Sequence, residues 1–246
     1  ILSLTTFQAR VKSVYYSIES LFDQDFPAHR IILWLSKDEF SGILALPGSL
    51  QRLQKRGLEI RFVEGNIKSY KKLVYALKEF PEAIIVTVDD DSFYPRYLLD
   101  GLVTAHKKFP KAIHCYRGNL ISFTDAGELL PYQKWQGADT NDIPDLRVFP
   151  TGVGGVLYPP KSLDKRVLDE KLFLKLAPSA DDIWFKAMAV LAGTPSLRIT
   201  DHIDLPKVIG SQRESLHEIN NRKGANDKQM EMVFREFSIN ADTFKN

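Results

Sequence analysis

The strongest strand signal in the chain is the apolar run Ala83–Val88, which continues directly into three consecutive aspartates, Asp89, Asp90 and Asp91. Only Thr87 interrupts the apolar character of this run. Adjacent carboxylates repel one another, so the triplet costs folding free energy unless a cation or hydrogen bonds offset the repulsion. Because ligands of open α/β sheets gather at the carboxyl ends of strands, the feature predicts a ligand site at the end of a buried strand.

Strands and helices alternate through the first half of the chain. Apolar runs predict further strands at 1–4, 30–35, 58–63 and 113–116. Helical spacing of apolar residues predicts helices over 11–22, around 50–56, from a Ser69 cap to just before Pro81, and from near Pro95. This order is typical of an α/β fold with an open, mostly parallel central sheet flanked by helices.

The second half of the chain has a different pattern. Residues 117–150 are polar and show few periodic runs, Val153–Tyr158 is a glycine-rich strand candidate, and the helix Ile183–Leu191 follows directly on Asp181–Asp182. There is no internal repeat and no long linker. We therefore expect one domain over 1–246, with one half at 1–116, a smaller mixed half at 117–200, and a polar tail at 201–246.

Composition excludes several classes of protein. Lys and Arg total 33 against 31 Asp and Glu, so the formal net charge of +2 provides no broad positive field, and we expect no nucleic-acid partner. A single cysteine, Cys115, excludes an internal disulfide framework and a multi-cysteine zinc site, and fits a reducing cytoplasm. No apolar run reaches the roughly 18–20 residues that cross a bilayer. The chain begins at Ile1 in a strand-like pattern, so we expect upstream residues to be missing.

The aspartate triplet suits a divalent cation. If the chain stays extended, side-chain alternation places Asp89 and Asp91 on one side and Asp90 on the other. Two carboxylates on one side suit Mn²⁺ or Mg²⁺ and leave coordination positions for diphosphate oxygens. The alternative is an Asx turn or a helix N-cap before Pro95, which needs only one aspartate.

Three motifs together resemble a known family. The strand–loop–helix start at the N-terminus, the run IIVTVDDD and the later ADDIW at 180–184 are similar to GT-A-fold glycosyltransferases, above all to the family-2-like bacterial enzymes that build surface polysaccharides. The likeness covers about residues 1–200. It implies that the triplet is a DXD motif that holds a metal against the donor diphosphate. It also implies that 1–116 binds the nucleotide, that 117–200 binds the acceptor, and that the tail is a lid.

The resemblance places the nucleoside near Thr5, Thr6 and Arg10; a helix cap and a solvated arginine are the alternatives. Lys68, Lys71 and Lys72 bracket the start of a predicted helix, where an anionic ligand would explain lysines that oppose the helix dipole. Tyr70 could stack on the base or lie in the core. The predicted donor-binding residues are Thr5, Thr6, Arg10, Lys68, Tyr70, Lys71, Asp89 and Asp90.

The resemblance places the catalytic carboxylate at Asp181–Asp182, where an inverting transferase needs one general base. We favour Asp182 over Asp181, and simple N-capping is the alternative. Further candidates are acceptor contacts at Gly154, Gly155, Trp135 and Trp184, with burial in the core as the alternative for both tryptophans, and a third metal ligand at His217, with an ordinary surface histidine as the alternative.

The sequence therefore predicts an inverting, Mn²⁺- or Mg²⁺-dependent transferase that moves a sugar from a nucleotide-sugar, UDP-sugar favoured, to a glycan or lipid-linked glycan. The resemblance implies a cytoplasmic location, with peripheral association with the inner face of the membrane left open. The rival functions are a non-catalytic carbohydrate-binding relative, a nucleotidyl- or phosphotransferase, and a hydrolase. The segment SLTTFQAR holds no glycine, which counts against the phosphotransferase class.

Overall fold

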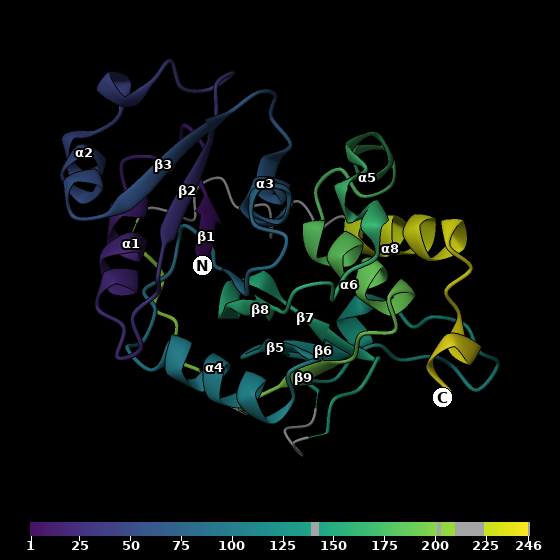
Figure 1. Ribbon diagram of the computed structural model, residues 1–246. Helices are drawn as coiled ribbons and strands as arrows, with labels where there is room; N and C mark the ends of the chain where they lie inside the picture. The colour runs from purple at the N-terminus through teal and green to yellow at the C-terminus, as the bar shows by residue number, and fades with distance from the viewer. Residues whose placement is uncertain (139–142, 201–202, 210–223, 246) are drawn as a thin grey trace.

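The computed structural model describes residues 1–138, 143–200, 203–209 and 224–245, and its centre is a seven-stranded sheet (Figure 1). The strand order is β3-β2-β1-β4-β8-β5-β9. The strands are β1 (Leu2–Thr5), β2 (Ile31–Ser36), β3 (Leu58–Val63), β4 (Ile85–Thr87), β5 (Ile113–Cys115), β8 (Val156–Tyr158) and β9 (Ser196–Arg198). The predicted open, mostly parallel α/β sheet is confirmed.

One strand breaks the parallel order. β8 pairs antiparallel with β4 on one side and with β5 on the other, whereas β3, β2, β1 and β4 are parallel neighbours, as are β5 and β9. A second sheet of two antiparallel strands, β6 (Gly118–Leu120) and β7 (Val148–Pro150), lies in the second half of the chain. This small sheet is the mixed region that the sequence predicts there.

Helices cover both faces of the sheet, because alternate strand residues point to opposite sides. Leu2, Leu4 and Leu33 pack in one core with α1 (Val14–Phe22), α2 (Gly48–Lys55) and α4 (Leu98–Lys108). Ile32 and Trp34 pack in the other core with α3 (Lys71–Glu79), α5 (Glu170–Leu176), α6 (Asp181–Leu191) and α8 (Ala225–Glu236). Figure 1 shows α5, α6 and α8 gathered on the side away from α1 and α2.

Three short elements differ from the sequence predictions. The helix predicted from residue 11 begins at Val14 after a run of turns. Ser69 is no helix cap: it lies in the 3-10 turn η2 (Lys68–Tyr70), and its hydroxyl bonds Asp181. The strand predicted from Val153 begins only at Val156, because Gly152–Gly154 form the 3-10 turn η4 and Gly155 has φ +81°.

The described part of the tail belongs to the packed fold. Met230, Val233 and Phe234 of α8 are buried in contact with α5 and α6. The segment 203–209 lies against the chain just after the aspartate triplet, where Val208 donates a backbone hydrogen bond to Asp91 and Phe93 donates one to Pro206. In the described ranges, no helix is long and apolar enough to cross a membrane.

Candidate functional site

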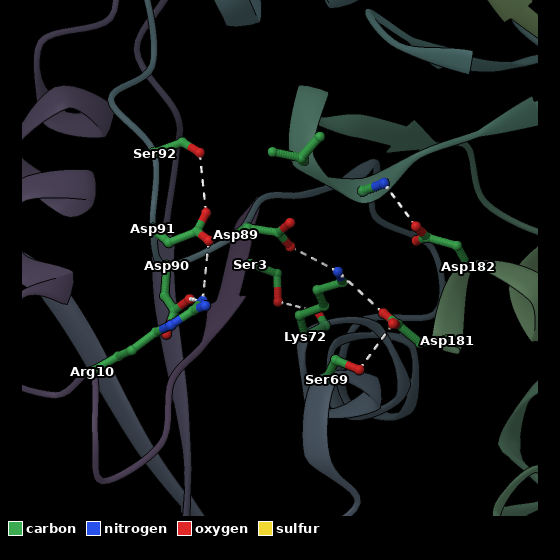
Figure 2. Close-up of polar contacts among 12 residues, drawn as sticks. Ser3, Arg10, Ser69, Lys72, Asp89, Asp90, Asp91, Ser92, Asp181 and Asp182 are labelled. Carbon is green, nitrogen blue, oxygen red and sulfur yellow. Dashed lines mark hydrogen bonds and ion pairs between the residues drawn. The ribbon is translucent and has the colours of Figure 1, made fainter. Parts of the chain in front are cut away.

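The two acidic motifs meet where β4 ends and α6 begins (Figure 2). The Lys72 ammonium lies between them, 2.9 Å from Oδ1 of Asp89 and 3.1 Å from Oδ2 of Asp181. The hydroxyl of Ser69 donates to Oδ1 of Asp181 at 2.8 Å. Residues more than 100 positions apart in the sequence therefore share one polar cluster, and its cation comes from the first turn of α3.

Lys72 is held firmly in this position. Its side chain is only 6% exposed, and the hydroxyl of Ser3 in β1 donates to its backbone carbonyl. Burial disfavours the charged ammonium, but the carboxylates of Asp181, Asp89 and Asp182 outweigh burial and raise the pKa of Lys72 well above its ordinary value. The cluster therefore holds a permanent positive charge among several carboxylates.

A second ion cluster holds the other two aspartates of the triplet. One guanidinium nitrogen of Arg10 lies 2.7 Å from Oδ1 of Asp90 and 3.2 Å from Oδ2 of Asp91. Thr6 donates to Oδ2 of Asp90 at 2.5 Å, and the Lys207 ammonium lies 2.8 Å from Oδ1 of Asp91. Burial outweighs these favourable contacts and raises the pKa of Asp90 above its ordinary value.

The expected alternation of the triplet does not hold. Asp90 and Asp91 share Arg10, whereas Asp89 turns to Lys72 (Figure 2). The physical reason is that β4 ends at Thr87, so the chain is no longer extended at the aspartates. Tyr94 stabilises this turn, because its hydroxyl accepts from the Asp89 N–H at 2.8 Å.

Asp182 lies one residue further into α6, with its Oδ2 accepting the Gly152 N–H at 3.0 Å (Figure 2). Burial and the neighbouring Asp181 carboxylate raise the pKa of Asp182 to about 7, although Lys72 and the Gly152 bond oppose the shift. A side chain at Gly152 would crowd the site, since an added Cβ would lie 2.9 Å from Nζ of Lys72 and 3.1 Å from Oδ1 of Asp182. The carboxyl group is thus poised to exchange a proton near neutral pH.

The carboxylates at the end of β4 differ in how well they could bind a divalent cation. The hard carboxylate oxygens of Asp89 and Asp91 are suitable ligands for Mn²⁺ or Mg²⁺. In the parts of the chain that are described, no group of three or more His, Cys, Asp or Glu side chains could hold a metal by itself. Asp89 is the most exposed of the triplet at 31%, and its Oδ2 takes no part in the Lys72 contact. Asp89 therefore fits a cation that is shared with oxygens of a bound ligand, whereas both oxygens of Asp91 are paired with Arg10 and Lys207.

The remaining predicted donor-side residues are placed differently from one another. Thr5 donates to the Trp34 carbonyl at 2.8 Å, within the sheet. Lys68 is exposed and donates to the Pro178 carbonyl at 3.2 Å. Lys71 is buried, donates to Asn66 at 2.7 Å and lies 3.5 Å from Glu39, away from the carboxylate cluster.

Tyr70 lies entirely in the core. Its ring stacks on Phe173 with 4.0 Å between the ring centroids, and its hydroxyl donates to the Ala177 carbonyl at 2.6 Å. No face of the ring is open to a nucleotide base. The structure therefore favours the core alternative for Tyr70.

The two tryptophans and two of the glycines also serve packing. Trp184 is fully buried, and Trp135 is 8% exposed with its indole N–H donating to the Leu130 carbonyl at 2.9 Å. An added Cβ at Gly154 would lie 3.0 Å from Arg117, and one at Gly155 would lie 3.3 Å from Leu98. These placements favour the core alternative for both tryptophans. His217 lies outside the described residues.

Four residues of the cluster were absent from the predicted site. Lys72 belongs to the lysine group that bracketed the helix start, but sequence spacing did not show which lysine faces the carboxylates. Gly152 is the first glycine of the glycine-rich run, and this position is the sequence feature that could have indicated its contact with Asp182. The sequence predicts Ser69 as a helix cap and not as a partner of Asp181. No local pattern pointed to Lys207, because it reaches Asp91 only through the folding of the tail.

No protein-family model and no curated protein matches the sequence of this chain. Solved structures do match its fold. A mannosyltransferase from Pyrobaculum calidifontis, PcManGT, in complex with GDP-Man and Mn²⁺, is 15% identical at a TM-score of 0.56, with 99% of this chain and 66% of that chain covered. The present chain thus spans just under two thirds of that protein.

TarS 1-349 from S. aureus is a second structural neighbour. Its complex with UDP is 17% identical at a TM-score of 0.53, over 97% of this chain and 71% of that chain. Its complex with UDP-GlcNAc is 16% identical at a TM-score of 0.52, over 97% and 72%. The chain therefore has the GT-A nucleotide-sugar glycosyltransferase fold, as the resemblance in its sequence implied.

Proposed function

We propose that this chain is a metal-dependent, inverting glycosyltransferase that moves a sugar from a nucleotide-diphosphate sugar to a hydroxyl group of a glycan or lipid-linked glycan. A UDP-sugar is the favoured donor. The observation that carries the proposal is the Lys72 ammonium, which lies within 3.1 Å of both Asp89 and Asp181. Through it the aspartate triplet and the carboxylate pair of α6 form one site, as a transfer between two substrates requires.

The donor side of the proposal rests on the triplet. Asp89 and Asp91 would hold a divalent cation together with diphosphate oxygens of the donor, and the bound cation would take up negative charge as the diphosphate leaves. Arg10 and Thr6 hold the carboxylate of Asp90, the third aspartate of the triplet, with contacts of 2.7 and 2.5 Å. The structural neighbours were crystallised with GDP-Man and Mn²⁺, with UDP or with UDP-GlcNAc, which supports a nucleotide-sugar as ligand without fixing its base.

The acceptor side rests on Asp182. An inverting transfer needs one base to remove the proton of the attacking hydroxyl as that oxygen bonds the anomeric carbon. A carboxylate with a pKa of about 7 is a suitable base near neutral pH, and the Gly152 N–H holds one of its oxygens. Asp181 is engaged by Lys72 and Ser69, which leaves Asp182 as the better candidate.

The proposed biological setting follows from the sequence motifs alone. Assembly of a bacterial surface polysaccharide, a cytoplasmic location and peripheral contact with the inner membrane face follow from the resemblance of the IIVTVDDD and ADDIW motifs to family-2-like enzymes.

The first test is donor binding by calorimetry with UDP-, GDP-, CMP- and dTDP-sugars, each with and without Mn²⁺. We expect one nucleotide class to bind in the presence of metal, and an Asp89→Ala/Asp91→Ala variant to lose that binding. An Asp100→Ala/Asp242→Ala variant, which removes two exposed carboxylates, is the matched control and should bind normally. If no nucleotide binds with metal present, the transferase proposal fails and carbohydrate binding without catalysis takes its place.

The second test addresses the stereochemistry. Once a donor is known, the anomeric configuration of the product is read by NMR at early reaction times. Inversion is expected, because a single base at Asp182 activates the acceptor directly. A retained configuration would contradict the role given to Asp182.

A further inference from the structure

α6 carries a buried charge that no step of the proposed reaction uses. Lys186 is the one ionisable residue between Ile183 and Val190, in a stretch where every residue is buried, and its own side chain is 2% exposed. In the described residues its Nζ has no hydrogen-bond partner. A methionine would fill similar space without the free-energy cost of an unpaired buried amine.

A second unpaired polar atom lies in the same place. Ser196 of β9 is fully buried, and its Oγ lacks a hydrogen-bond partner among the residues described. Lys186, Ser196, Tyr158 and Asp182 all line one small cavity of about 10 Å³. A space of roughly 10–15 Å³ with two to four polar partners is what one buried water molecule needs.

The geometry connects this cavity to the proposed base. Asp182 and Lys186 are four residues apart in α6, so their side chains leave the helix on the same face, one turn from each other. Both residues line the cavity, and its other walls are mostly apolar: Ile113, Pro150, Phe185 and Ala189. A water molecule there would have Lys186, Ser196 and Asp182 as its polar neighbours.

We propose that Lys186 and Ser196 hold an internal water molecule in this cavity, and that Lys186 acts through this water as a positioning residue for the Asp182 carboxylate. The inference rests on the proposed function for the role of Asp182 as a base. The ordered water orients the carboxyl group together with the Gly152 N–H. Through this water the amine hydrogen-bonds to Asp182 and favours its ionised form, which is the form that accepts the acceptor's proton.

The pKa of the Lys186 amine is set mainly by its burial. Burial lowers the pKa of Lys186 to about 7, against the opposing influence of Cys115 in β5 and Asp145 beside β7. The other ionisable groups that line the cavity are Tyr158 of β8 and Asp182 on the same helix, and Arg198 of β9 acts on Cys115. Near neutral pH the amine exists in both forms, and either form can hydrogen-bond to a water molecule.

The test compares Lys186→Met with a matched exposed control, Lys175→Met on α5. For Lys186→Met we expect an unchanged or higher melting temperature, because an unpaired buried amine is removed, together with a severalfold lower kcat. The acid limb of kcat/KM should move to higher pH by half a unit or more, since loss of the positive charge raises the pKa of Asp182. Ser196→Ala should lower kcat with a smaller shift of that limb.

Two measurements independent of turnover separate this inference from the proposed function. The first is the pH dependence of unfolding for the wild type, Lys186→Met, Asp182→Asn and the double variant. If Lys186 and Asp182 are coupled, Lys186→Met should change the pH dependence of unfolding in the wild-type background but not in the Asp182→Asn background. The second is a high-resolution crystal structure, which should show one ordered water in the cavity.

The outcomes are distinct. Coupling and an ordered water in a protein that binds no nucleotide-sugar would support the pairing of Lys186 with Asp182 and refute the transferase. An active transferase whose acid limb and unfolding dependence are the same with and without Lys186 would overturn the inference. A cavity that contains no water would overturn it as well.

Discussion

Asp182 is a residue whose position suits proton transfer better than it suits stability. It is partly buried beside Asp181, so its ionised form is less favourable in the folded protein than in the unfolded chain, and its pKa rises from 3.8 to about 7. A carboxyl group with a raised folded pKa contributes its stability below the unfolded pKa and loses that contribution as the pH rises through the folded value. The protein is therefore expected to lose stability between about pH 4 and pH 7 on account of this group.

Replacing Asp182 by asparagine tests both properties at once. Because asparagine keeps the acceptor for the Gly152 N–H but cannot take a proton, kcat should fall by at least roughly 100-fold. At pH 8–9 the free energy of unfolding of the variant should exceed that of the wild type by about 2–4 kcal/mol. Near pH 4 the two proteins should be equally stable. Urea titrations across this pH range provide the measurement. A variant that is less stable than the wild type at pH 9 would contradict the electrostatic account.

Lys72 has the opposite effect on stability. Lys72→Met would leave Asp89 and Asp181 facing each other without the cation between them, so we expect a loss of about 3–5 kcal/mol in unfolding free energy. Lys78→Met on the same helix is the matched control, because its ion pair with Glu170 is largely exposed and contributes no more than about 1 kcal/mol. Equal stabilities of the two variants at pH 7 would show that Lys72 does not hold the cluster together.

For single residues, the sequence predicted which side chains form the site better than it predicted which side chains contact each other. The acidic motifs stand out because three aspartates after an apolar strand need a physical reason. The partner of each aspartate could not be read in the same way, since Arg10, Lys72 and Lys207 approach from three separate segments. Tyr70, Trp135 and Trp184 show the reverse problem, because an aromatic residue has the same local pattern in a core as on a sugar platform.

Among the elements, the glycine-rich turn η4 and the residue that follows it contain glycines with two different roles, which the sequence does not distinguish. Gly152 faces Lys72 and Asp182 and has no positive φ angle, so its lack of a side chain serves the site. Gly155 has φ +81° and lies against Leu98, so its lack of a side chain serves the backbone and the core. The two positions should therefore fail in different ways when they are changed.

Alanine substitution at each glycine separates these two roles. Gly152→Ala should lower kcat/KM by roughly tenfold or more while unfolding changes little, because the new Cβ displaces the Lys72 and Asp182 side chains. Gly155→Ala should cost about 1–3 kcal/mol of stability through its strained φ angle, with kcat/KM of the folded protein close to that of the wild type. Thermal melts and initial rates on the same preparations give the comparison. The same ratio of activity loss to stability loss in both variants would contradict the separate roles given to Gly152 and Gly155.

For the whole molecule, local pattern predicted the elements but not how the chain joins them. The alternation of apolar strands and amphipathic helices carries the α/β class, because that pattern depends on neighbours in sequence. The antiparallel insertion of β8 between β4 and β5 depends on the path of the whole chain, and nothing within Val156–Tyr158 specifies its direction or its partners. The site could not be predicted from local pattern for the same reason, since η4 reaches Lys72 only because β8 lies next to β4.

This strand order has a consequence for folding. β5 belongs to the predicted half 1–116, yet it contacts β4 only through β8, which belongs to the other half. Neither half can complete the sheet alone, so the two halves should unfold in a single cooperative transition. Trp34 lies in the first half, while Trp135 and Trp184 lie in the second, and all three are buried. Variants that keep only Trp34, or only Trp184, with phenylalanine at the other positions, should give fluorescence transitions with the same midpoint in urea. Separate midpoints would show that the halves are independent folding units.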